Sequence, residues 1–558
     1  MKRNQIIQGC IVLAVTVAIF GTASMGTIVE AEENQTKAQT ERTSVKEEGD
    51  RKVSELLKKQ KETWEQIQDV YDVSQQEKIR EKLEEKKAST EYTFNNMLIE
   101  RNPFGTNSLS LYVYFNTEDA VNVAYTVHVK DSSISDFGRN VYQEQHYQTE
   151  HEFQIVGLVP EMENQITFFL TRKDGSTDTK RIVMEMGSVM GSERVNLERM
   201  MEGDAEELEA GLYVVMGDGI EPLDFMYYYD NEGVLRGEIP LLGYRSHRLI
   251  FDQDSMYYSI SETKMAQVNR IGQVTNIYDL GRYQLHHDYV FDENGNMLIL
   301  ATDTEQDSVG DVMLKLDVNS GEVTEVLDLG DLFASYKSEC QKNSMGELDW
   351  MHIDAVQWIG NESVLLSSRE TSSIIKVDNI YDAPVISYMI GEKSFWADTE
   401  YESLVFGKDG EFTSQGGQHS IAYVEDDSLE DGQYYLYMFN NNIGISESKP
   451  DYDWSSIGLA KKGPEDEAVS YYYKYLVDEN AGTYCLVDSF EVPYSEEAGS
   501  AQEVGGNVVA CSGTQAIFGE YDAEHKLIAS YKIDAEKGIY RVYKYDFGGF
   551  YFEDEKDE

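Results

Sequence analysis

DWMHIDAVQWIGNESVLLSSR, residues Asp349 to Arg369, is the stretch around which the predicted fold is organised. It sets His352 between two carboxylates, crosses a turn at Gly360-Asn361 and follows an apolar run to Arg369. Glycine and asparagine mark turns, and a short apolar run bounded by turn residues is typical of a buried strand. The stretch therefore predicts two strands of a β-propeller blade, with His352 before the first and Arg369 after the second.

Strand–turn–strand units like this one recur from about Gly211 to the end of the chain. The other turns lie at Asp230 to Gly233, Ile271-Gly272, Asn294 to Asn296, Asn319 to Gly321, Asp431-Gly432, Glu479 to Gly482, Gly505 to Asn507 and Asp522 to His525. Repeats of this kind are typical of propeller blades. The fold prediction is all-β, with a β-propeller of about six blades over residues 205–558. A sandwich of packed sheets or a β-helix is the competing architecture, and a β-helix needs shorter repeats.

Two smaller regions precede the propeller. Residues 96–190 hold alternating strands such as LSLYVYF, VNVAYTVHV and NQITFFL, which predicts a small β-sandwich domain. Residues 32–95 are charged and predict a helical stalk, in which Ser44 with Glu47 forms a capping box and a further helix begins at Ser74. The apolar stripe of the stalk suits packing on the body of the protein, and it could also support a homodimer.

Residues 1–31 have the features of an export signal. Lys2 and Arg3 precede an uncharged segment, Gly9 to Val29, and small residues follow up to Ala31. This order is typical of a signal peptide. The uncharged segment is nearly long enough to span a bilayer, so a retained membrane anchor is the alternative. Either interpretation places the remaining chain outside the cytoplasm, secreted or anchored to the outer face of the cytoplasmic membrane.

Composition narrows the function. The formal net charge of −55 and the pI of 4.4 argue against a nucleic-acid partner, because a surface that follows phosphates needs clustered Lys and Arg. The 38 tyrosines and 8 prolines suit an all-β body. Cys485 and Cys511 could pair in an oxidising compartment, although buried free thiols are the favoured interpretation.

Histidine motifs occupy equivalent places in three of the units, at His286-His287, His352 and His419. The innermost strands of a propeller converge on its axis, so histidines that are far apart in sequence can meet there. A lone histidine is most simply a satisfied polar residue near the channel. Histidines in register, with Arg369 close behind one of them, predict a shared site.

Two kinds of shared site are open. Neutral imidazoles are the commonest metal ligands, but Arg369 would repel a cation and the chain has no HExxH or paired CxxC spacing. An oxyanion site gives each of these histidines and Arg369 a role, because a guanidinium binds two oxygens at once and imidazoles donate the remaining hydrogen bonds. We therefore expect an anion site without a metal. The sequence also has no phosphate-binding P-loop, and no cofactor is expected.

Four phrases in order resemble the bacterial aryl-sulfate sulfotransferase (arylsulfotransferase) family: LHHDYVFDENGNMLIL, DWMHIDAVQWIGNESVLLSSR, FGKDGEFTSQGGQHSIAYV and SAQEVGGNVVACSG. The resemblance extends over nearly everything after the stalk. It implies that His419 is the nucleophile and that His352 is the general acid and base. It implies further that Arg369 stabilises the sulfuryl oxygens together with His286 or, alternatively, His287.

The resemblance also implies a reaction. A sulfuryl group passes from an aryl sulfate ester to a phenolic acceptor by a ping-pong mechanism through a sulfohistidine, without a nucleotide sulfate donor. Two other functions stay open at this point. One is a non-enzymatic secreted propeller that binds a ligand or partner, and the other is an aryl sulfate hydrolase.

One departure from the family concerns Asp354, where many relatives have asparagine. A carboxylate there would either orient His352 or repel the sulfuryl group. Near the motifs, Trp350, Trp396 and Phe406 could line a phenol pocket or belong to the core.

Overall fold

The computed structural model describes residues 58–59, 61–191, 197–201, 203, 206–217, 223–459, 468–535 and 538–554. The predicted export signal and the first part of the predicted stalk lie outside these residues. The chain divides into two compact units, Met1–Glu62 and Thr63–Glu558, and every element named below belongs to the second. Within the described ranges, no helix combines the length and the apolar character that crossing a membrane requires.

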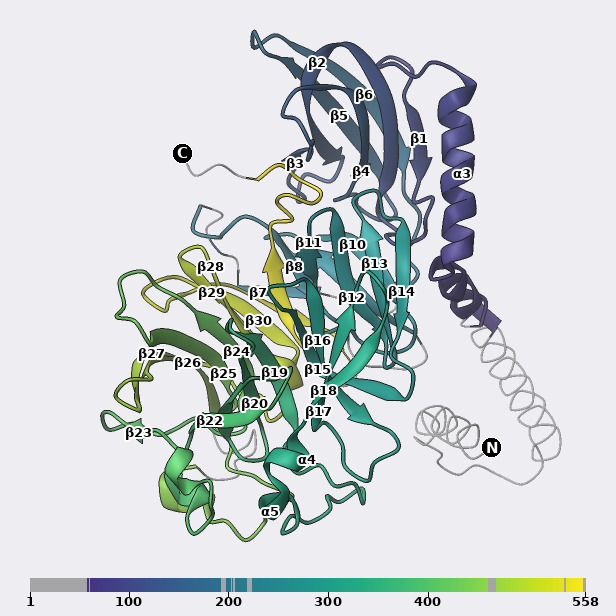
Figure 1. The fold of residues 1–558 in the computed structure, drawn as a ribbon. Coiled ribbons are helices and arrows are strands. Elements are labelled where there is room, and N and C mark those ends of the chain that lie inside the picture. The colour runs from purple at the N-terminus through teal and green to yellow at the C-terminus, as the bar shows by residue number, and fades with distance from the viewer. Residues whose placement is uncertain are drawn as a thin grey trace, which may run out of the picture. The chain divides into compact units, whose positions relative to one another are not determined.

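Helix α3 (Val73–Ser89) belongs to the predicted stalk and packs on the β structure (Figure 1). Its N-cap is Asp72, whose side chain accepts hydrogen bonds from the backbone NH groups of Ser74 and Gln75. The predicted helix start at Ser74 is therefore wrong, because the carboxylate of Asp72 already satisfies the first NH groups. Leu83 is buried in an apolar cluster with residues of the first β domain, which fixes α3 on the body.

The first β domain consists of six strands. They are β1 (Leu98–Arg101), β2 (Leu111–Val129), β3 (Phe137–Asn140), β4 (Gln148–Ile155), β5 (Glu163–Arg172) and β6 (Thr177–Glu185). The long strand β2 pairs with β1 and β4 along its first part and with β3 and β5 mainly along its second part. Alternate residues of β5 are buried, as expected for a strand with one face on a core. The predicted small β domain is confirmed.

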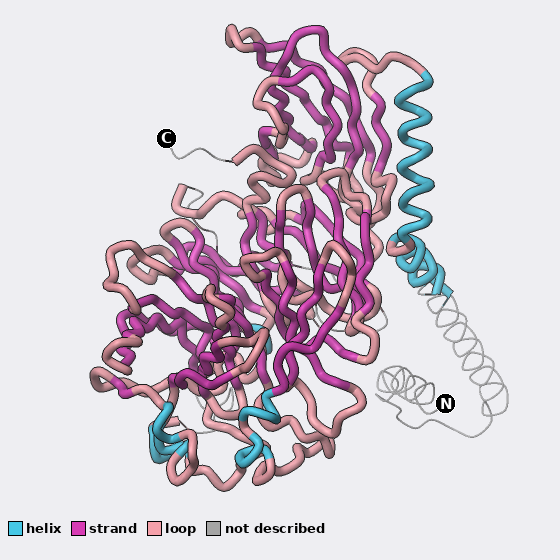
Figure 2. Tube along the Cα trace, in the orientation of Figure 1, coloured by secondary structure: helices cyan, strands magenta, loops and turns pink. Residues whose placement is uncertain are grey.

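Six further sheets follow (Figure 1), and strands dominate the whole of this region in Figure 2. In order of pairing, the first sheet contains β32 (Val542–Tyr545), β8 (Leu212–Val215), β9 (Asp224–Tyr229) and β10 (Leu235–Leu241), and the second contains β11 (Ile250–Asp252), β12 (Ser255–Ser261), β13 (Lys264–Asn269) and β14 (Val274–Asp279). The third contains β15 (Tyr283–Phe291), β16 (Asn296–Asp303), β17 (Val312–Asp317) and β18 (Val323–Asp328), and the fourth contains β19 (Ile353–Trp358), β20 (Val364–Ser368), β21 (Ser373–Asp378) and β22 (Val385–Ile390). The fifth contains β24 (His419–Val424), β25 (Gln433–Asn440), β26 (Val469–Asp478), β27 (Thr483–Pro493) and β23 (Gly407–Lys408), and the sixth contains β28 (Ser500–Val504), β29 (Asn507–Ser512), β30 (Ile517–Tyr521), β31 (Leu527–Ile533) and β7 (Leu197–Met201).

Short helices lie in the connections between these strands. They are α4 (Leu329–Leu332), α5 (Ala334–Lys337), η2 (Lys393–Trp396), η3 (Glu402–Leu404), η4 (Trp454–Ile457) and η6 (Gly513–Gln515).

Strands from both ends of this region complete two of the sheets. β32 pairs with β8, and β7, which precedes the predicted propeller start at residue 205, pairs with β31. The strands β15, β19, β24, β28 and β32 contact one another in succession, so the first strands of neighbouring sheets lie side by side. The all-β, propeller-like fold predicted from the sequence is confirmed.

The first strand of three consecutive sheets loses its regular register at the histidine motif. The register shifts between Leu285 and Tyr289 in β15, between Ile353 and Ala355 in β19, and between His419 and Ile421 in β24. His287, His352 and Ser420 have positive φ angles of 65°, 46° and 50°. Bulges re-aim side chains, and strained non-glycine residues of this kind cluster at functional sites. The backbone is therefore irregular at the place where the motifs meet.

The aromatic residues near the motifs belong to the core. Trp350 and Trp396 are fully buried in one apolar cluster, and the ring of Phe406 stacks on Tyr388 at a centroid distance of 4.0 Å. Cys340, Cys485 and Cys511 are free thiols in the structure.

Candidate active site

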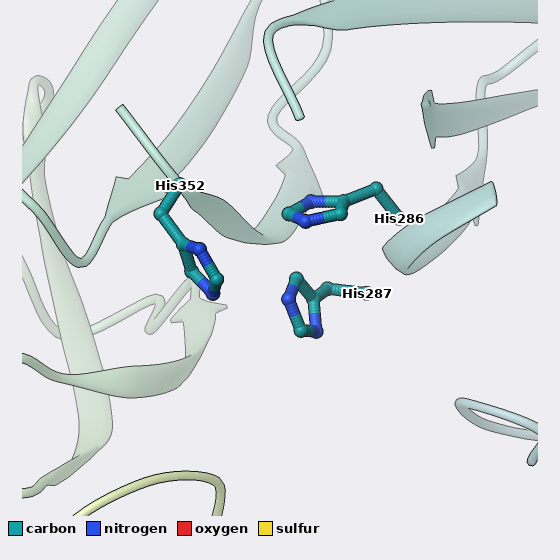
Figure 3. A group of neighbouring side chains, drawn as sticks. All are labelled: His286, His287 and His352. Atoms are coloured by element: carbon teal, nitrogen blue, oxygen red, sulfur yellow. The ribbon is translucent and has the colours of Figure 1, made fainter. Parts of the chain in front are cut away.

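The structure brings the predicted histidines together, and Figure 3 shows three of them, His286, His287 and His352. The ring centroids lie 5.1 Å apart for His286 and His352, 4.8 Å for His287 and His352, and 6.1 Å for His287 and His419. These residues are far apart in sequence, but β15, β19 and β24 are neighbours. Each imidazole lies at or next to the bulge of its strand, which is why the rings can converge.

A cavity of about 380 Å³ opens beside these rings. Its wall includes four predicted site residues, His287, His352, Arg369 and His419. It also includes Arg245, Glu497, Thr514 and Tyr540. Two larger hollows of about 660 and 610 Å³ lie against the first β domain and contain none of the predicted site residues. The cavity at the histidines is therefore the candidate active site.

His352 is held by a carboxylate. Its Nδ1 lies 2.6 Å from Oδ2 of Asp349, so Asp349, and not Asp354, orients this ring. When Nδ1–H donates to Asp349, Nε2 keeps its lone pair. Burial, followed by the charges of Arg369 and Arg245, holds the pKa of His352 well below its usual range. The lowered pKa favours the neutral form of His352.

His419 is the first residue of β24, and its ring is buried. Nδ1 lies 3.6 Å from Oδ2 of Asp354. Burial is the main cause that holds the pKa of His419 well below its usual range, and the charges of Arg369, His352 and Arg541 act in the same direction. A neutral imidazole keeps a lone pair, so His419 can act as a nucleophile.

The two residues of the His286-His287 motif have different places. Nδ1 of His286 lies 3.1 Å from the carbonyl oxygen of Ile353, and this ring is not part of the cavity wall. His287 is in the wall, and its Nδ1 lies 3.0 Å from the hydroxyl of Tyr540. Burial lowers the pKa of His286 to about 4 and that of His287 well below its usual range. Of the two candidates, His287 is the one that faces the cavity.

Arg369 follows β20 directly, and its backbone NH donates to the carbonyl of His352 at 3.1 Å. Its Nη2 lies 3.8 Å from Oε1 of Glu497, a side chain that is 71% exposed. Nε of Arg369 is buried and has no hydrogen-bond partner in the described part of the chain. An ion pair with an exposed carboxylate is weak, so the guanidinium has donors left for the oxygens of an anion.

Arg245 and Tyr540 belong to the site and are missed by sequence reasoning. The guanidinium of Arg245 lies 4.2 Å from the centroid of the Tyr540 ring. Arg245 contributes to the lowered pKa of His287 and of His352, so it adds a second positive charge at the cavity. Both residues lie in connections outside the strands, where no repeat spacing or motif marks them.

Asp288, the residue after His287, has a structural role, because its carboxylate pairs with two arginines. Its carboxylate lies 2.8 Å from Nε of Arg248 and 3.3 Å from Nη1 of Arg541. Arg541 also donates to the backbone carbonyl of Asp354 at 2.7 Å. These buried contacts join strands of different sheets and leave the Asp288 carboxylate paired.

The three histidines in Figure 3 could also hold a metal ion. His286, His287 and His352 offer ring nitrogens within 4.8 Å of one another. Arg369 and Arg245 create a positive field there, which contributes to the lowered pKa of His352. Such a field opposes a cation and favours an anion. The arrangement fits an oxyanion better than a metal.

The fold and the site together define an all-β, propeller-like protein in which imidazoles and guanidinium groups line one cavity. A family model described as Arylsulfotransferase (ASST) matches residues 198–544, and a model described as Arylsulfotransferase Ig-like domain matches residues 98–187. The chain belongs to the arylsulfotransferase family. Membership indicates aryl sulfotransferase activity, with an aryl sulfate donor and a phenol acceptor.

No curated protein matches the chain. Among solved structures, a putative 6-phosphogluconolactonase from Bacteroides fragilis is 9% identical with a TM-score of 0.34, over 76% of this chain and 98% of that one. A functionally unknown protein from Desulfotomaculum acetoxidans is 9% identical with a TM-score of 0.33, over 68% of this chain and 95% of that one. Similarities at this level add nothing to the family assignment.

Proposed function

We propose that this chain transfers a sulfuryl group from an aryl sulfate to a phenol through a sulfohistidine at His419, in a ping-pong reaction without a nucleotide donor. The observation that carries the proposal is the buried imidazole of His419 in the wall of the same cavity as Arg369, with a pKa that burial holds below its usual range. A nucleophile next to a group that binds the anion is what covalent group transfer needs.

In the first half-reaction, a ring lone pair of His419 attacks sulfur while the bond between sulfur and the aryl oxygen breaks. The aryl oxygen keeps the bonding electrons and leaves as a phenolate, which is a good leaving group because a phenol has a pKa of about 10. Sulfuryl transfer resembles phosphoryl transfer in its loose transition state, so the protein chiefly positions the group and stabilises its outer oxygens. Arg369 binds two of these oxygens. His287, rather than His286, lies beside the third. The hydroxyl of Tyr540 donates to the carbonyl oxygen of His287 at 3.0 Å, so Nδ1 of His287 donates to Tyr540 and Nε2 donates to the anion when the ring is protonated.

In the second half-reaction, the acceptor phenol attacks sulfur and the electrons of the N–S bond return to His419. His352 takes the phenol proton on Nε2, while its Nδ1–H stays with Asp349. By microscopic reversibility the same nitrogen gives a proton to the departing phenolate in the first half-reaction. The bound anion offsets the field of Arg369 and Arg245, and this raises the pKa of His352 toward the range that acid catalysis needs.

Incubation with p-nitrophenyl sulfate, with and without a second phenol, tests the proposal. We expect steady release of nitrophenol only with the acceptor, because only the acceptor discharges the sulfohistidine. Steady release without acceptor would identify a hydrolase, and no release would leave a binding propeller.

EDTA is expected to leave the rate unchanged. Loss of the rate in EDTA and its recovery with Zn²⁺ would instead assign His286, His287 and His352 to a metal.

The acid limb of kcat/KM is expected below the usual imidazole pKa of about 6.5. Protonation of His419 removes the attacking lone pair, so the rate falls as pH drops through its pKa in the free protein. Because burial, Arg369, His352 and Arg541 lower that pKa, the fall moves to more acidic pH. Asp354, which faces His419, has a pKa raised well above its usual range by burial, which favours its neutral form.

Initial rates measured in stopped assays from about pH 5 to about pH 8 check this expectation. The samples are made alkaline before reading, so that the colour of nitrophenol does not depend on the assay pH. A half-maximal rate at about pH 6.5 would indicate an ordinary solvated imidazole and would contradict the lowered pKa.

A further inference from the structure

Asp354 and His419 are buried neighbours whose facing atoms lack other partners. Their side chains are 0% and 3% exposed, and Oδ2 lies 3.6 Å from Nδ1. In the described part of the chain, neither carboxyl oxygen of Asp354 has a hydrogen-bond partner, and neither does Nδ1 of His419. Buried polar atoms that stay unpaired are costly. Closing the short gap between these groups is therefore favoured.

The neighbouring carboxylates are engaged elsewhere. Asp349 contacts His352 at 2.6 Å, and Asp288 pairs with Arg248 at 2.8 Å. The hydroxyl of Ser367 accepts from the amide of Gln418 at 3.0 Å, which leaves its hydrogen to donate toward Asp354, and this contact lowers the pKa of Asp354 against the effect of burial. Of the carboxylates at the site, Asp354 is the one left beside His419.

We propose that Asp354 is a positioning residue that accepts Nδ1–H of His419 and thereby keeps the lone pair on Nε2 for attack on sulfur. The inference rests on the proposed function of His419. A gap of 3.6 Å exceeds a hydrogen bond, but contacts of this kind often tighten when substrate binds.

The attack on sulfur strengthens the contact between His419 and Asp354. As the bond from Nε2 to sulfur forms and the bond to the aryl oxygen breaks, the ring becomes positively charged and Nδ1–H becomes a stronger donor. The hydrogen stays on Nδ1, and the phenolate carries the electrons away. A neutral carboxyl group and a carboxamide both offer an acceptor oxygen, so the role does not require that Asp354 be ionised.

Asn441 is the competing acceptor. Its NH₂ group donates to the carbonyls of Ser495 and Ala498 at 2.9 and 3.0 Å, which leaves Oδ1 unpaired in the described part of the chain. It also raises the pKa of His419 as a hydrogen-bonding neighbour. We favour Asp354 because its Oδ2 lies 3.6 Å from Nδ1 and has no hydrogen-bond partner in the described part of the chain, whereas the side chain of Asn441 is already held by two backbone carbonyls.

Kinetics of two variants separate positioning from mere packing. Asp354→Leu removes the acceptor at similar size, and we expect kcat to fall about 10²-fold or more with little change in KM, because a wrong tautomer costs up to about 10⁴ in related dyads. Asp354→Asn keeps an acceptor oxygen and is expected to retain more of the rate than Asp354→Leu. Asp292→Leu is the matched control, since Asp292 is a buried carboxyl bonded to Asn296 and Tyr381 outside the cavity.

A second measurement does not depend on a variant that folds. Nitrogen-15 NMR of the histidines in the unaltered protein, with His419 assigned by comparison with His419→Ala, is expected to show hydrogen on Nδ1. An Nε2–H tautomer there would overturn the inference for any acceptor at Nδ1. An unchanged kcat in Asp354→Leu would overturn it and leave Asn441 as the acceptor. Trapping of sulfohistidine tests the proposed function separately. Its absence from the natural protein would remove His419 as nucleophile, whereas its formation at full rate in Asp354→Leu would remove only the role of Asp354.

Discussion

Replacing His419 by alanine is expected to lower acceptor-dependent release of nitrophenol by at least about 10⁴-fold, as loss of a covalent nucleophile does elsewhere. The reason is that the first half-reaction has no other attacking group in the proposed mechanism, because Nε2 of His352, the ring nitrogen that Asp349 leaves free, serves in proton transfer. His419→Asn is expected to have the same effect, because a carboxamide keeps the polarity of the side chain and offers no basic lone pair. Steady-state rates and trapping of the sulfated protein measure the loss.

His151→Asn provides the control for loss of a buried imidazole. His151 is 1% exposed and lies on β4 in the first β domain, where its ring stacks on Phe115. We expect this variant to lose stability and to keep its rate for each folded molecule. Normal turnover in either His419 variant would take the nucleophile role away from this residue.

Replacing Arg369 by alanine is expected to lower kcat by about 10²- to 10³-fold, or about 2.7–4 kcal/mol of transition-state stabilisation. Among the residues that the structure describes, the guanidinium pairs with the exposed Glu497 at 3.8 Å and Nε has no hydrogen-bond partner, so donors are available to the sulfuryl oxygens. Arg369→Lys keeps the charge but loses the fork of parallel donors, and we expect a rate between those of the natural protein and the alanine variant. Parallel kcat and KM values show whether the loss lies in the transition state.

Glu497→Gln is the companion variant for Arg369. It removes a 71% exposed carboxylate from the guanidinium and is expected to change the rate little, because exposed ion pairs contribute weakly. An unchanged rate in Arg369→Ala would contradict the oxyanion site. A rate loss in Glu497→Gln as large as that in Arg369→Ala would show that the ion pair, rather than the free donors, matters.

Much of the fold could be predicted because its signals are local. The turn at Gly360-Asn361 and the apolar run after it identify two strands from neighbouring residues alone, and repetition of the pattern along the chain indicates blades. The start of α3 was missed by the same kind of reasoning, because Asp72 and Ser74 are both good caps and only the folded backbone shows which one accepts the NH groups.

The sequence by itself determined the all-β class, the first β domain, and the motifs that bring His352, His419 and Arg369 to one cavity, because residue types and strand spacing already carry that information. Tertiary structure alone decided that His287 rather than His286 faces the cavity, that Asp354 lies beside His419, and that Arg245 and Tyr540 join the site. The physical reason is that strand bulges redirect side chains, and contacts between sheets depend on packing across the propeller axis rather than on neighbours in the chain.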